Sequence, residues 1–510
     1  MIETAKRERK PRDLAAEVGW WLGGPLLRPI GSVFAAVVVT AGPWLVSVIA
    51  LVIVSIGMQP VMGGATIEDL RLTVVYAFCV APLVSGPVGA IAARLVVASL
   101  EERAGRLIPE IFCVASAVSG LVAQALAVAV ALSLGIEPAG IAIGFVFLSS
   151  AAALLWTSFA VLAALRAYRF LIAAFSFGMI FSVLCILLTA RSEPSVERMI
   201  WSFTAGIVFC VAAASARICA GRGARNADLS LAALLLTGEI SRNWRICLGI
   251  FFAISGVWVD KWVFWFGSEG ARSAAGYLHY SVYDSVMFVA HLSIIPSFAM
   301  MLMFQRGELD NVIKLFRRTL LERPSYGRVA KAVRGLEKVI WNRLIMIAFV
   351  QATSSIALLL ITPLVAEVLT FDFAQFVMLR VGVVAVFLQS LIYMSSFVLV
   401  LCNRISLFLF TQALFFSVNI IASTACLAIV GVSAYGVFFS SLIVSAILFP
   451  CAFAAISKYD YLTFVGENEG LYDKGMVGKT RETMTGGSGL RVRLANARDE
   501  WCQLASPVDH

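Results

Sequence analysis

Long apolar stretches separated by short polar loops run through almost the whole chain. Each stretch has about 20 residues or more, which is enough for a helix to cross a hydrocarbon layer about 30 Å thick. The stretches are continuous rather than alternating, and this favours helices over the strands of a membrane barrel. The pattern predicts an all-α polytopic membrane protein with about twelve transmembrane helices. We place them near residues 31–56, 72–93, 111–134, 140–163, 168–189, 198–218, 244–266, 278–303, 341–362, 376–401, 405–430 and 434–456.

Lys and Arg gather in alternate loops, and the loops between them hold mainly Asp and Glu. Positive loops tend to stay in the cytoplasm, so we expect the N and C termini to be cytoplasmic. The net charge of +9 then reflects this orientation and contact with anionic lipid, and no nucleic acid is expected as a partner. The basic segments are residues 1–30, 94–110, 164–169, 217–245, 304–340 and the tail after residue 456.

The basic connection in the middle of the chain divides the twelve stretches into six and six. This number is typical of transporters built from two bundles, although we find no residue-level repeat between the halves. The predicted organisation is a basic N-terminal segment (1–30), an N-terminal six-helix bundle (31–218), a linker (219–243), a C-terminal bundle (244–456) and a largely disordered tail (457–510). The C-terminal bundle contains the cytoplasmic loop 305–340, whose apolar face of Val312, Leu315, Phe316 and Leu320 suits a helix on the inner leaflet, a docked partner or an ordinary linker.

Composition argues against an enzyme. Ten cysteines lie mostly within or beside the apolar stretches without CxxC spacing, and the chain has three histidines, so neither metal site nor disulfide is expected. The sequence offers no nucleophile–base pair and no intact phosphate-binding loop. We therefore expect no cofactor and no catalytic residues.

The seventh stretch carries an unusual charged and aromatic end. At about 100° per residue, Trp258, Lys261, Trp262 and Trp265 share one helical face and Asp260 points away from it. Indole rings beside an ammonium form cation–π contacts, and flat aromatic rings also suit stacking against sugars. The alternative is an aromatic belt at the interface with a lysine that reaches towards water.

The eighth stretch returns at a similar depth with a second polar set. Tyr280, Asp284, Met287 and His291 are spaced by four, three and four residues, and Tyr283 lies beside them. An ionised carboxylate in a bilayer needs a partner or water, so we expect Asp284 to face Lys261, a tyrosine or a hydrated cavity. Our hypothesis is that these residues line a translocation route; a static ion pair between two helices is the alternative.

Three further features suggest gating or bending. Arg380, after Glu367 and Asp372, suits an outer gate or a side chain that reaches the interface. Gly42 with Pro43 in the first stretch, and Pro82 with Pro87 in the second, interrupt helical hydrogen bonding. These kinks suit either bending during transport or fixed bends.

Three motifs resemble the PelG family of Pel exopolysaccharide transporters. They are Ala41-Gly42-Pro43-Trp44-Leu45-Val46-Ser47, the run from Gly256 to Phe266 (GVWVDKWVFWF), and the run from Tyr280 to Phe288 (YSVYDSVMF). The resemblance covers residues 30–457 and departs from the family at both ends. It implies two six-helix bundles that form a V and open alternately to either side. It also implies passage of a polysaccharide and partnership with a cytoplasmic glycosyltransferase and small membrane-anchored Pel components, at least one of which senses cyclic di-GMP.

The residues allow four functions to be compared. A transporter of a nascent polysaccharide agrees with the aromatic outer half and the large basic inner loop. An ion-coupled multidrug antiporter of the same fold usually has a deep acid in its N-terminal bundle, which this chain lacks, but Asp260 and Asp284 could serve instead. A flippase for a lipid-linked oligosaccharide calls for several cavity arginines, and Arg94 and Arg380 are the candidates. A non-transporting scaffold fits poorly with the deep ionisable residues.

Overall fold

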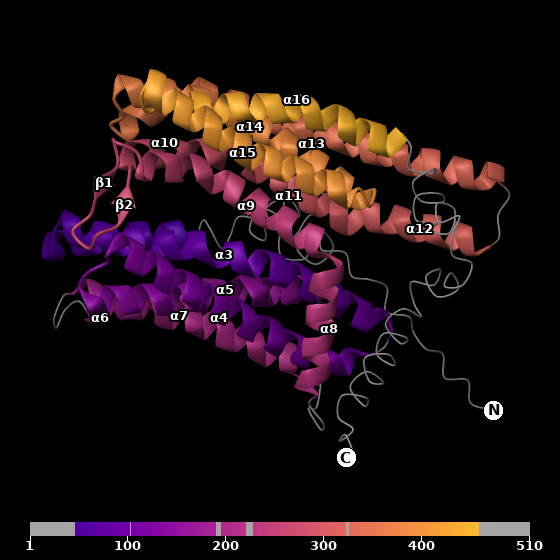
Figure 1. Cartoon of the computed structure of the whole chain (residues 1–510), viewed down its shortest axis with the longest axis horizontal. Coiled ribbons are helices and arrows are strands. Elements are labelled where there is room, and N and C mark those ends of the chain that lie inside the picture. Colours follow the sequence, from indigo (N-terminus) through magenta and orange to yellow (C-terminus); the bar gives the residue numbers. More distant parts are fainter. Residues whose placement is uncertain (1–45, 103, 190–194, 221–227, 323–325, 458–510) are drawn as a thin grey trace, which may run out of the picture.

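A computed structural model describes residues 46–102, 104–189, 195–220, 228–322 and 326–457, and nearly all of these residues are helical (Figure 1). Among them, ten helices are long and apolar enough to cross a membrane, and a bent helix pair supplies an eleventh. A shorter apolar helix, Val46–Met62, lies where the first stretch was predicted. Each predicted stretch thus contains a helix, and the all-α polytopic fold is confirmed. Gly42 and Pro43, residues 1–30 and the tail 458–510 lie outside the described residues.

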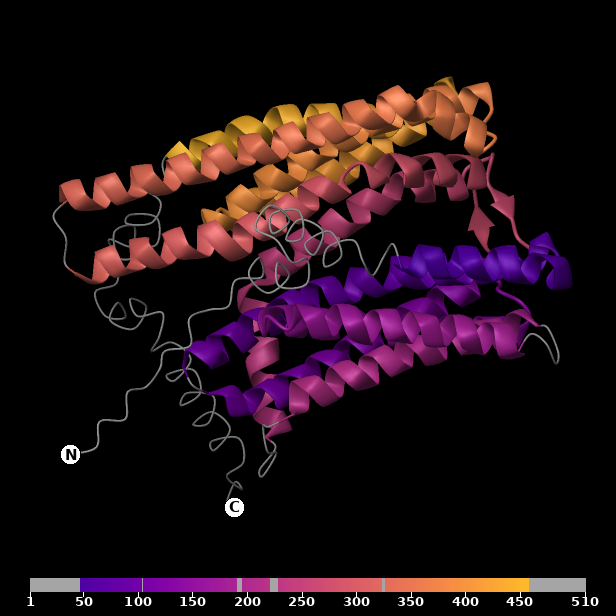
Figure 2. The same cartoon turned by 180° about the vertical axis from the view of Figure 1, so that it is seen from behind.

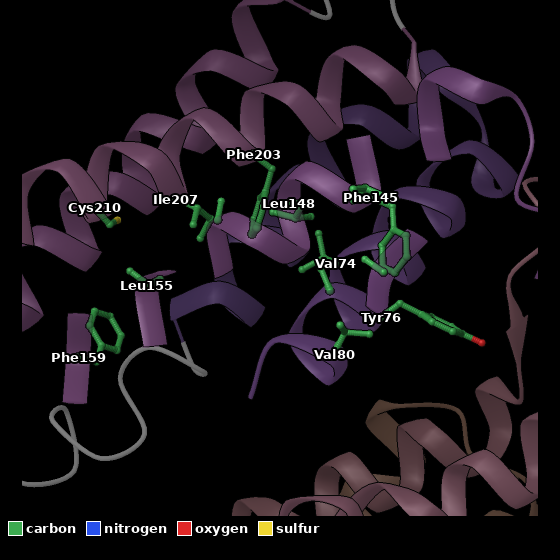
Figure 3. Packing of buried hydrophobic residues seen from close by; sticks show 14 of the residues in the cluster. Val74, Tyr76, Val80, Phe145, Leu148, Leu155, Phe159, Phe203, Ile207 and Cys210 are labelled. Carbon is green, nitrogen blue, oxygen red and sulfur yellow. The ribbon is translucent and has the colours of Figure 1, made fainter. Parts of the chain in front are cut away.

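The N-terminal half is a bundle of long helices. They are α3 (Gly64–Glu101), α4 (Ile108–Leu134, preceded by the 3-10 turn Gly105–Leu107), α5 (Ala139–Ala164), α6 (Tyr168–Thr189), α7 (Val196–Cys219) and α8 (Leu229–Arg242). Its core forms where α3, α5 and α7 meet, with Val74, Phe145, Leu148 and Phe203 buried together (Figure 3). Tyr76 lies at the edge of this core with its hydroxyl directed outward.

The C-terminal half begins with α9 and continues through a two-stranded hairpin into a second group of helices (Figures 1 and 2). The elements are α9 (Trp244–Trp265), β1 (Ala271–Arg272), β2 (Leu278–His279), α10 (Ser281–Leu292), α11 (Ile295–Phe304), the π-helical turn η2 (Gln305–Leu309), α12 (Asp310–Leu321), α13 (Tyr326–Val368), α14 (Phe373–Leu401), α15 (Ile405–Ile429) and α16 (Tyr435–Ser457). The strands pair antiparallel, Ala271 with His279 and Arg272 with Leu278. α10 and α11 are bent by 42° within one predicted stretch.

Helix α9 contacts both halves, because it packs along α15 and also against α3. Two glycines allow the close approach to α15. A Cβ atom at Gly249 would collide with the ring of Phe408, and one at Gly256 with the ring of Phe415. Asn419 Nδ2 of α15 then donates to the Gly256 carbonyl oxygen at 3.0 Å. Such small residues and interhelical amide bonds are how membrane helices pack without a hydrophobic driving force.

The predicted linker 219–243 contains a helix that the sequence did not reveal. Helix α8 is capped by Asp228, whose carboxylate accepts from Leu231 N at 3.0 Å. It runs across the ends of the other N-terminal helices and packs against α4 (Figure 1). With 14 residues it is too short to cross a bilayer as a helix.

The predicted amphipathic helix in loop 305–340 is present as α12, and its apolar face has a partner within the chain. Val312 packs against a core cluster that includes Leu336 and Ile340 of α13, and Phe316 is buried. Leu315, by contrast, is 65% exposed, and the side chain of Leu320 lies outside the described residues. The α12–α13 pair extends beyond the other helices (Figure 2). The apolar face is therefore covered at Val312 and Phe316 and open at Leu315, and α12 lies against α13.

Candidate functional site

The last turns of α9 place Asp260 in the interior. Asp260 is only 1% exposed. Its Oδ2 accepts a hydrogen bond from the Tyr283 hydroxyl of α10 at 2.6 Å. The Lys261 Nζ lies 3.6 Å from the same oxygen. A buried carboxylate is stable only with such partners. Asp260 therefore joins α9 to α10 through a tyrosine that the sequence pattern did not assign to it.

Lys261 occupies the aromatic face predicted for it. Its ammonium donates to the Val257 carbonyl oxygen at 3.1 Å and lies 5.7 Å from the centre of the Trp258 ring. The latter distance suits a cation–π contact. The ammonium is thus held between a carboxylate, a carbonyl and an indole rather than reaching towards water.

Asp284 has an aromatic partner. Trp265 Nε1 donates to Asp284 Oδ2 at 2.8 Å, so the carboxylate is bound by α9 through an indole and not by direct contact with Lys261. The indole of Trp265 also stacks on Tyr76 of α3, with ring centres 4.9 Å apart and planes at 25°. Trp258 meets the edge of Trp265 at 6.4 Å. The aromatic face of α9 is therefore packed against the N-terminal bundle in this conformation.

His291 lies two turns further along α10. Its Nδ1 is 2.7 Å from the Met287 carbonyl oxygen, and a carbonyl accepts only, so Nδ1 carries the proton. Its Nε2 faces the Gln389 side chain, whose amide oxygen, like Nε2, is without a donor among the described residues in the orientation shown. Gln389 of α14 and the Asp260–Lys261 pair are its polar neighbours.

We call the charged and aromatic residues of α9 and α10 described above the α9–α10 cluster. The remaining predicted site residues flank this cluster or lie apart from it. Tyr280 is the residue that precedes α10 and packs against both the N-terminal core and a core of the C-terminal half. Arg380 is exposed on α14 with its guanidinium 5.7 Å from the centre of the Phe376 ring. Asp372, expected near it, instead caps α14 by accepting from Gln375 N at 2.7 Å. Pro82 and Pro87 lie inside the 38-residue helix α3, where each removes a backbone donor.

A set of contacts absent from the sequence prediction joins the two halves beside the cluster. We call residues 271–279 the hairpin clamp. Ala275 N donates to Asp69 Oδ1 at 3.1 Å, and the Thr73 and Tyr277 hydroxyls lie 3.0 Å apart. Tyr277 is fully buried and Asp69 is 4% exposed. The start of α3 therefore receives the loop that connects α9 to α10.

Further hydrogen bonds extend the hairpin clamp to the end of α4 and to the loop before α5. Glu137 N donates to the Ala275 carbonyl oxygen at 3.1 Å, and Arg272 Nη2 donates to the Leu134 carbonyl oxygen at 2.7 Å. Tyr76, which stacks on Trp265, also donates through its hydroxyl to the Leu278 carbonyl oxygen at 2.7 Å. The hairpin clamp bridges the two groups of helices at the end opposite α8 (Figure 1), which is the predicted outer end.

One cross-bundle ion pair lies towards the other end, among the residues that the structure describes. Arg166, in the turn after α5, places Nη2 3.0 Å from Asp310 Oδ2 at the start of α12. Lys314 shares that oxygen at 2.7 Å. Exposed pairs of this kind contribute about 0–1 kcal/mol. The hairpin clamp, with its buried bonds, is the stronger connection.

The hairpin clamp should loosen in acid through His279. Its Nε2 lies 3.4 Å from Glu68 Oε1, yet burial, more than the opposing charge of Glu68, holds its pKa below the ordinary 6.5. In an undocked hairpin His279 has the higher pKa and binds a proton more readily than in the docked one. Docking of the hairpin on the N-terminal bundle is therefore fully favoured above pH 6.5, and it weakens as the pH falls through the pKa of the docked His279. We expect faster amide exchange in residues 271–279, by a factor of about 10 for each unit between the two pKa values.

Hydrogen exchange at about pH 5 and about pH 7.5, corrected for intrinsic rates, measures this effect. His279→Gln, which has no titratable ring, should remove the difference between the two conditions. Equal acid sensitivity in wild type and His279→Gln would assign the loosening to another group.

The fold is shared with solved transporters. The chain resembles a MATE transporter in complex with MaD5 (TM-score 0.59, 12% identity, covering 86% of this chain and 99% of that one). It also resembles a variant of the Vibrio cholerae MATE transporter VcmN (0.56, 12%, 87% and 96%). An outward-facing multidrug resistance MATE family transporter of the MOP superfamily is a third (0.54, 12%, 85% and 97%). At this identity the likeness shows the fold alone.

Sequence comparison is more specific. No curated protein matches the chain. The model of the PelG exopolysaccharide exporter (EPS-E) family matches residues 24–464, which include both bundles, the hairpin clamp and the cluster of α9 and α10. The chain is a multi-pass membrane transporter protein and belongs to the PelG exopolysaccharide exporter family.

Proposed function

We propose that this protein moves a nascent, Pel-like polysaccharide across the bacterial inner membrane by alternating access between its two bundles. The family match supports the substrate class. The observation that carries the mechanism is the hairpin clamp, which concentrates the polar contacts between the bundles at the predicted outer end. Opening of that end would release these bonds and move Trp265, Ala275 and Tyr277 away from the N-terminal core, to which they contribute.

The aromatic cluster would then become the sugar-contacting surface. In the closed arrangement one face of Trp265 is covered by Tyr76 of the other bundle. Separation of α3 from α9 uncovers that face beside Trp258 and Trp262. A flat indole next to hydrogen-bonding carboxylates provides both the stacking and the polar contacts that sugar rings need. We infer that Trp258, Trp262, Trp265, Tyr280, Tyr283 and the charges at 260, 261 and 284 line the route.

The basic α12–α13 pair is the proposed contact for the synthetic machinery. Lys314, Arg318, Lys331 and Arg334 are all exposed on it, and under the predicted orientation they face the cytoplasm. A cytoplasmic glycosyltransferase that delivers the growing chain, membrane-anchored Pel-type components and anionic lipid are the expected partners. An ion-coupled drug antiporter or a flippase for a lipid-linked oligosaccharide is the competing function on this fold.

Polysaccharide secretion and drug tolerance, measured side by side, test the proposal. A deletion strain complemented with Trp265→Ala should lose most secreted polymer at wild-type protein level, with unchanged tolerance to cationic drugs. Trp201→Ala, which removes a tryptophan that is 42% exposed on α7, is the matched control and should secrete normally. Normal secretion with increased drug sensitivity in the deletion strain would make the protein a drug antiporter instead.

A further inference from the structure

The cluster between α9 and α10 contains more negative than positive charge. The carboxyl groups of Asp260 and Asp284 face a single ammonium, that of Lys261, and His291 is the remaining ionisable base beside them. If both carboxyl groups are ionised and the imidazole is neutral, one negative charge is uncompensated inside the bundle. Such a charge costs several kcal/mol in a membrane interior. The cluster therefore lacks one positive charge.

The cluster also lacks hydrogen-bond donors. Asp260 Oδ1 and Asp284 Oδ1 are buried carboxylate oxygens without a hydrogen-bond partner among the described residues. Beside them, His291 Nε2 and Gln389 Oε1 face each other as two acceptors, and these two pair when the Gln389 amide is turned so that its NH2 group donates to the imidazole. Each of the two carboxylate oxygens is an acceptor when the carboxyl groups are ionised. Buried polar atoms in native proteins are nearly always paired, and an unpaired one calls for an explanation. We call these four residues the acceptor cluster.

The neighbouring elements do not supply the missing charge. Tyr76 and Cys79 approach from α3, Tyr283 from α10 and Tyr393 from α14, and all of these are neutral in their protonated forms. Gln389, also on α14, is neutral and is 2% exposed. Among the described residues, Lys261 is the cation within this set.

We propose that the acceptor cluster binds one exchangeable proton, and that the proton is released when the two bundles separate. A carboxyl O–H or an imidazolium N–H supplies both the positive charge and a donor for the unpaired acceptors. A proton suits this set better than a transition-metal ion, because the described residues contain no group of three or more His, Cys, Asp or Glu placed to hold one. The titration below separates the proton from a sodium ion.

Trp265 provides the link to conformation. It donates to Asp284 and stacks on Tyr76 of the other bundle, so separation of the bundles disturbs the environment of that carboxyl group directly. Entry of water favours the ionised carboxylate, and the proton leaves. This step deepens the proposed function by naming its energy source, since a proton gradient would then favour one orientation of the transporter.

Indole fluorescence of the purified full-length protein tests proton binding without any transported substrate. Trp258, Trp262 and Trp265 are next to the titrating groups, so we expect a sigmoidal change with pH, between about pH 5 and 9, that is the same in KCl and NaCl. Asp284→Asn keeps an oxygen for Trp265 but removes the titrating carboxyl group, and should abolish or shift the transition by more than a pH unit. Glu269→Gln, at an exposed acid in the loop before the hairpin, should leave the transition unchanged.

His291→Gln gives a second test that does not depend on the folding of the Asp284 variant. A transition unaltered in both variants would overturn the proposal. A sodium-dependent transition at constant pH would replace the proton by a sodium ion and overturn it as well. The titration is independent of export: a transition without polysaccharide secretion would contradict the proposed function alone, and secretion without a transition would contradict the proton site alone.

Discussion

A disulfide between cysteines at positions 137 and 275 is expected to stop polysaccharide secretion almost completely, and reduction is expected to restore it. The backbone hydrogen bond from Glu137 N to the Ala275 carbonyl oxygen is 3.1 Å long. It brings the two residues close enough for the Cα separation of about 4.4–6.8 Å that a disulfide needs. This bond joins the N-terminal bundle to the hairpin clamp. A covalent link there would prevent opening of the predicted outer end.

The experiment uses Glu137→Cys and Ala275→Cys in a chain whose native cysteines have been replaced and which still secretes polymer. Each single variant should secrete normally under oxidising conditions. Ser119→Cys with Thr157→Cys is the matched pair, because these side chains lie 2.9 Å apart but both belong to the N-terminal bundle. Complete cross-linking at 137 and 275 with undiminished secretion would show that the hairpin clamp does not open during transport.

Asp260→Ala is expected to produce the largest loss of stability. The change leaves the Lys261 ammonium without its carboxylate in a buried position and removes the acceptor of the Tyr283 hydroxyl. Removing one partner of a buried ion pair costs about 3–5 kcal/mol. We expect a strongly lowered melting temperature in detergent and little protein in the membrane.

Removal of both charges should recover part of this loss. In Asp260→Ala combined with Lys261→Ala no charge is left uncompensated at the pair, so the double variant should be more stable than Asp260→Ala alone. Glu269→Ala, which removes an exposed acid from the neighbouring loop, serves as the control and should melt like the wild type. A melting temperature of Asp260→Ala close to that of the wild type would mean that the buried pair contributes little.

The transmembrane helices could be predicted because bilayer thickness sets the length of an apolar stretch, and this property is local. The helical period likewise placed Lys261 beside Trp258 and separated Asp260 from them. Partner choice between helices has no such local signal. Nothing in the spacing indicates that Tyr283 binds Asp260 or that Trp265, rather than Lys261, binds Asp284.

The hairpin clamp was missed for the same reason on a larger scale. Asp69 and Ala275 are separated by 206 positions, and neither the acid near the start of α3 nor the short loop after α9 is unusual alone. Helix α8 escaped prediction because its 14 residues follow a basic segment rich in glycine and resemble a connection. Both features depend on how the two halves meet.

The length of α13 has a mechanical consequence. Its 43 residues extend about 65 Å at 1.5 Å per residue, roughly twice the thickness of the hydrocarbon layer. One end pairs with α12 beyond the other helices, and the other end leads through a short turn to α14. Pro363 removes one backbone hydrogen bond near the far end, and the helix before it behaves as a stiff rod. A tilt imposed at the α12 end therefore displaces the region of Pro363 by an amount proportional to the distance. A protein bound at one side of the membrane would thereby move the opposite side without any diffusing signal.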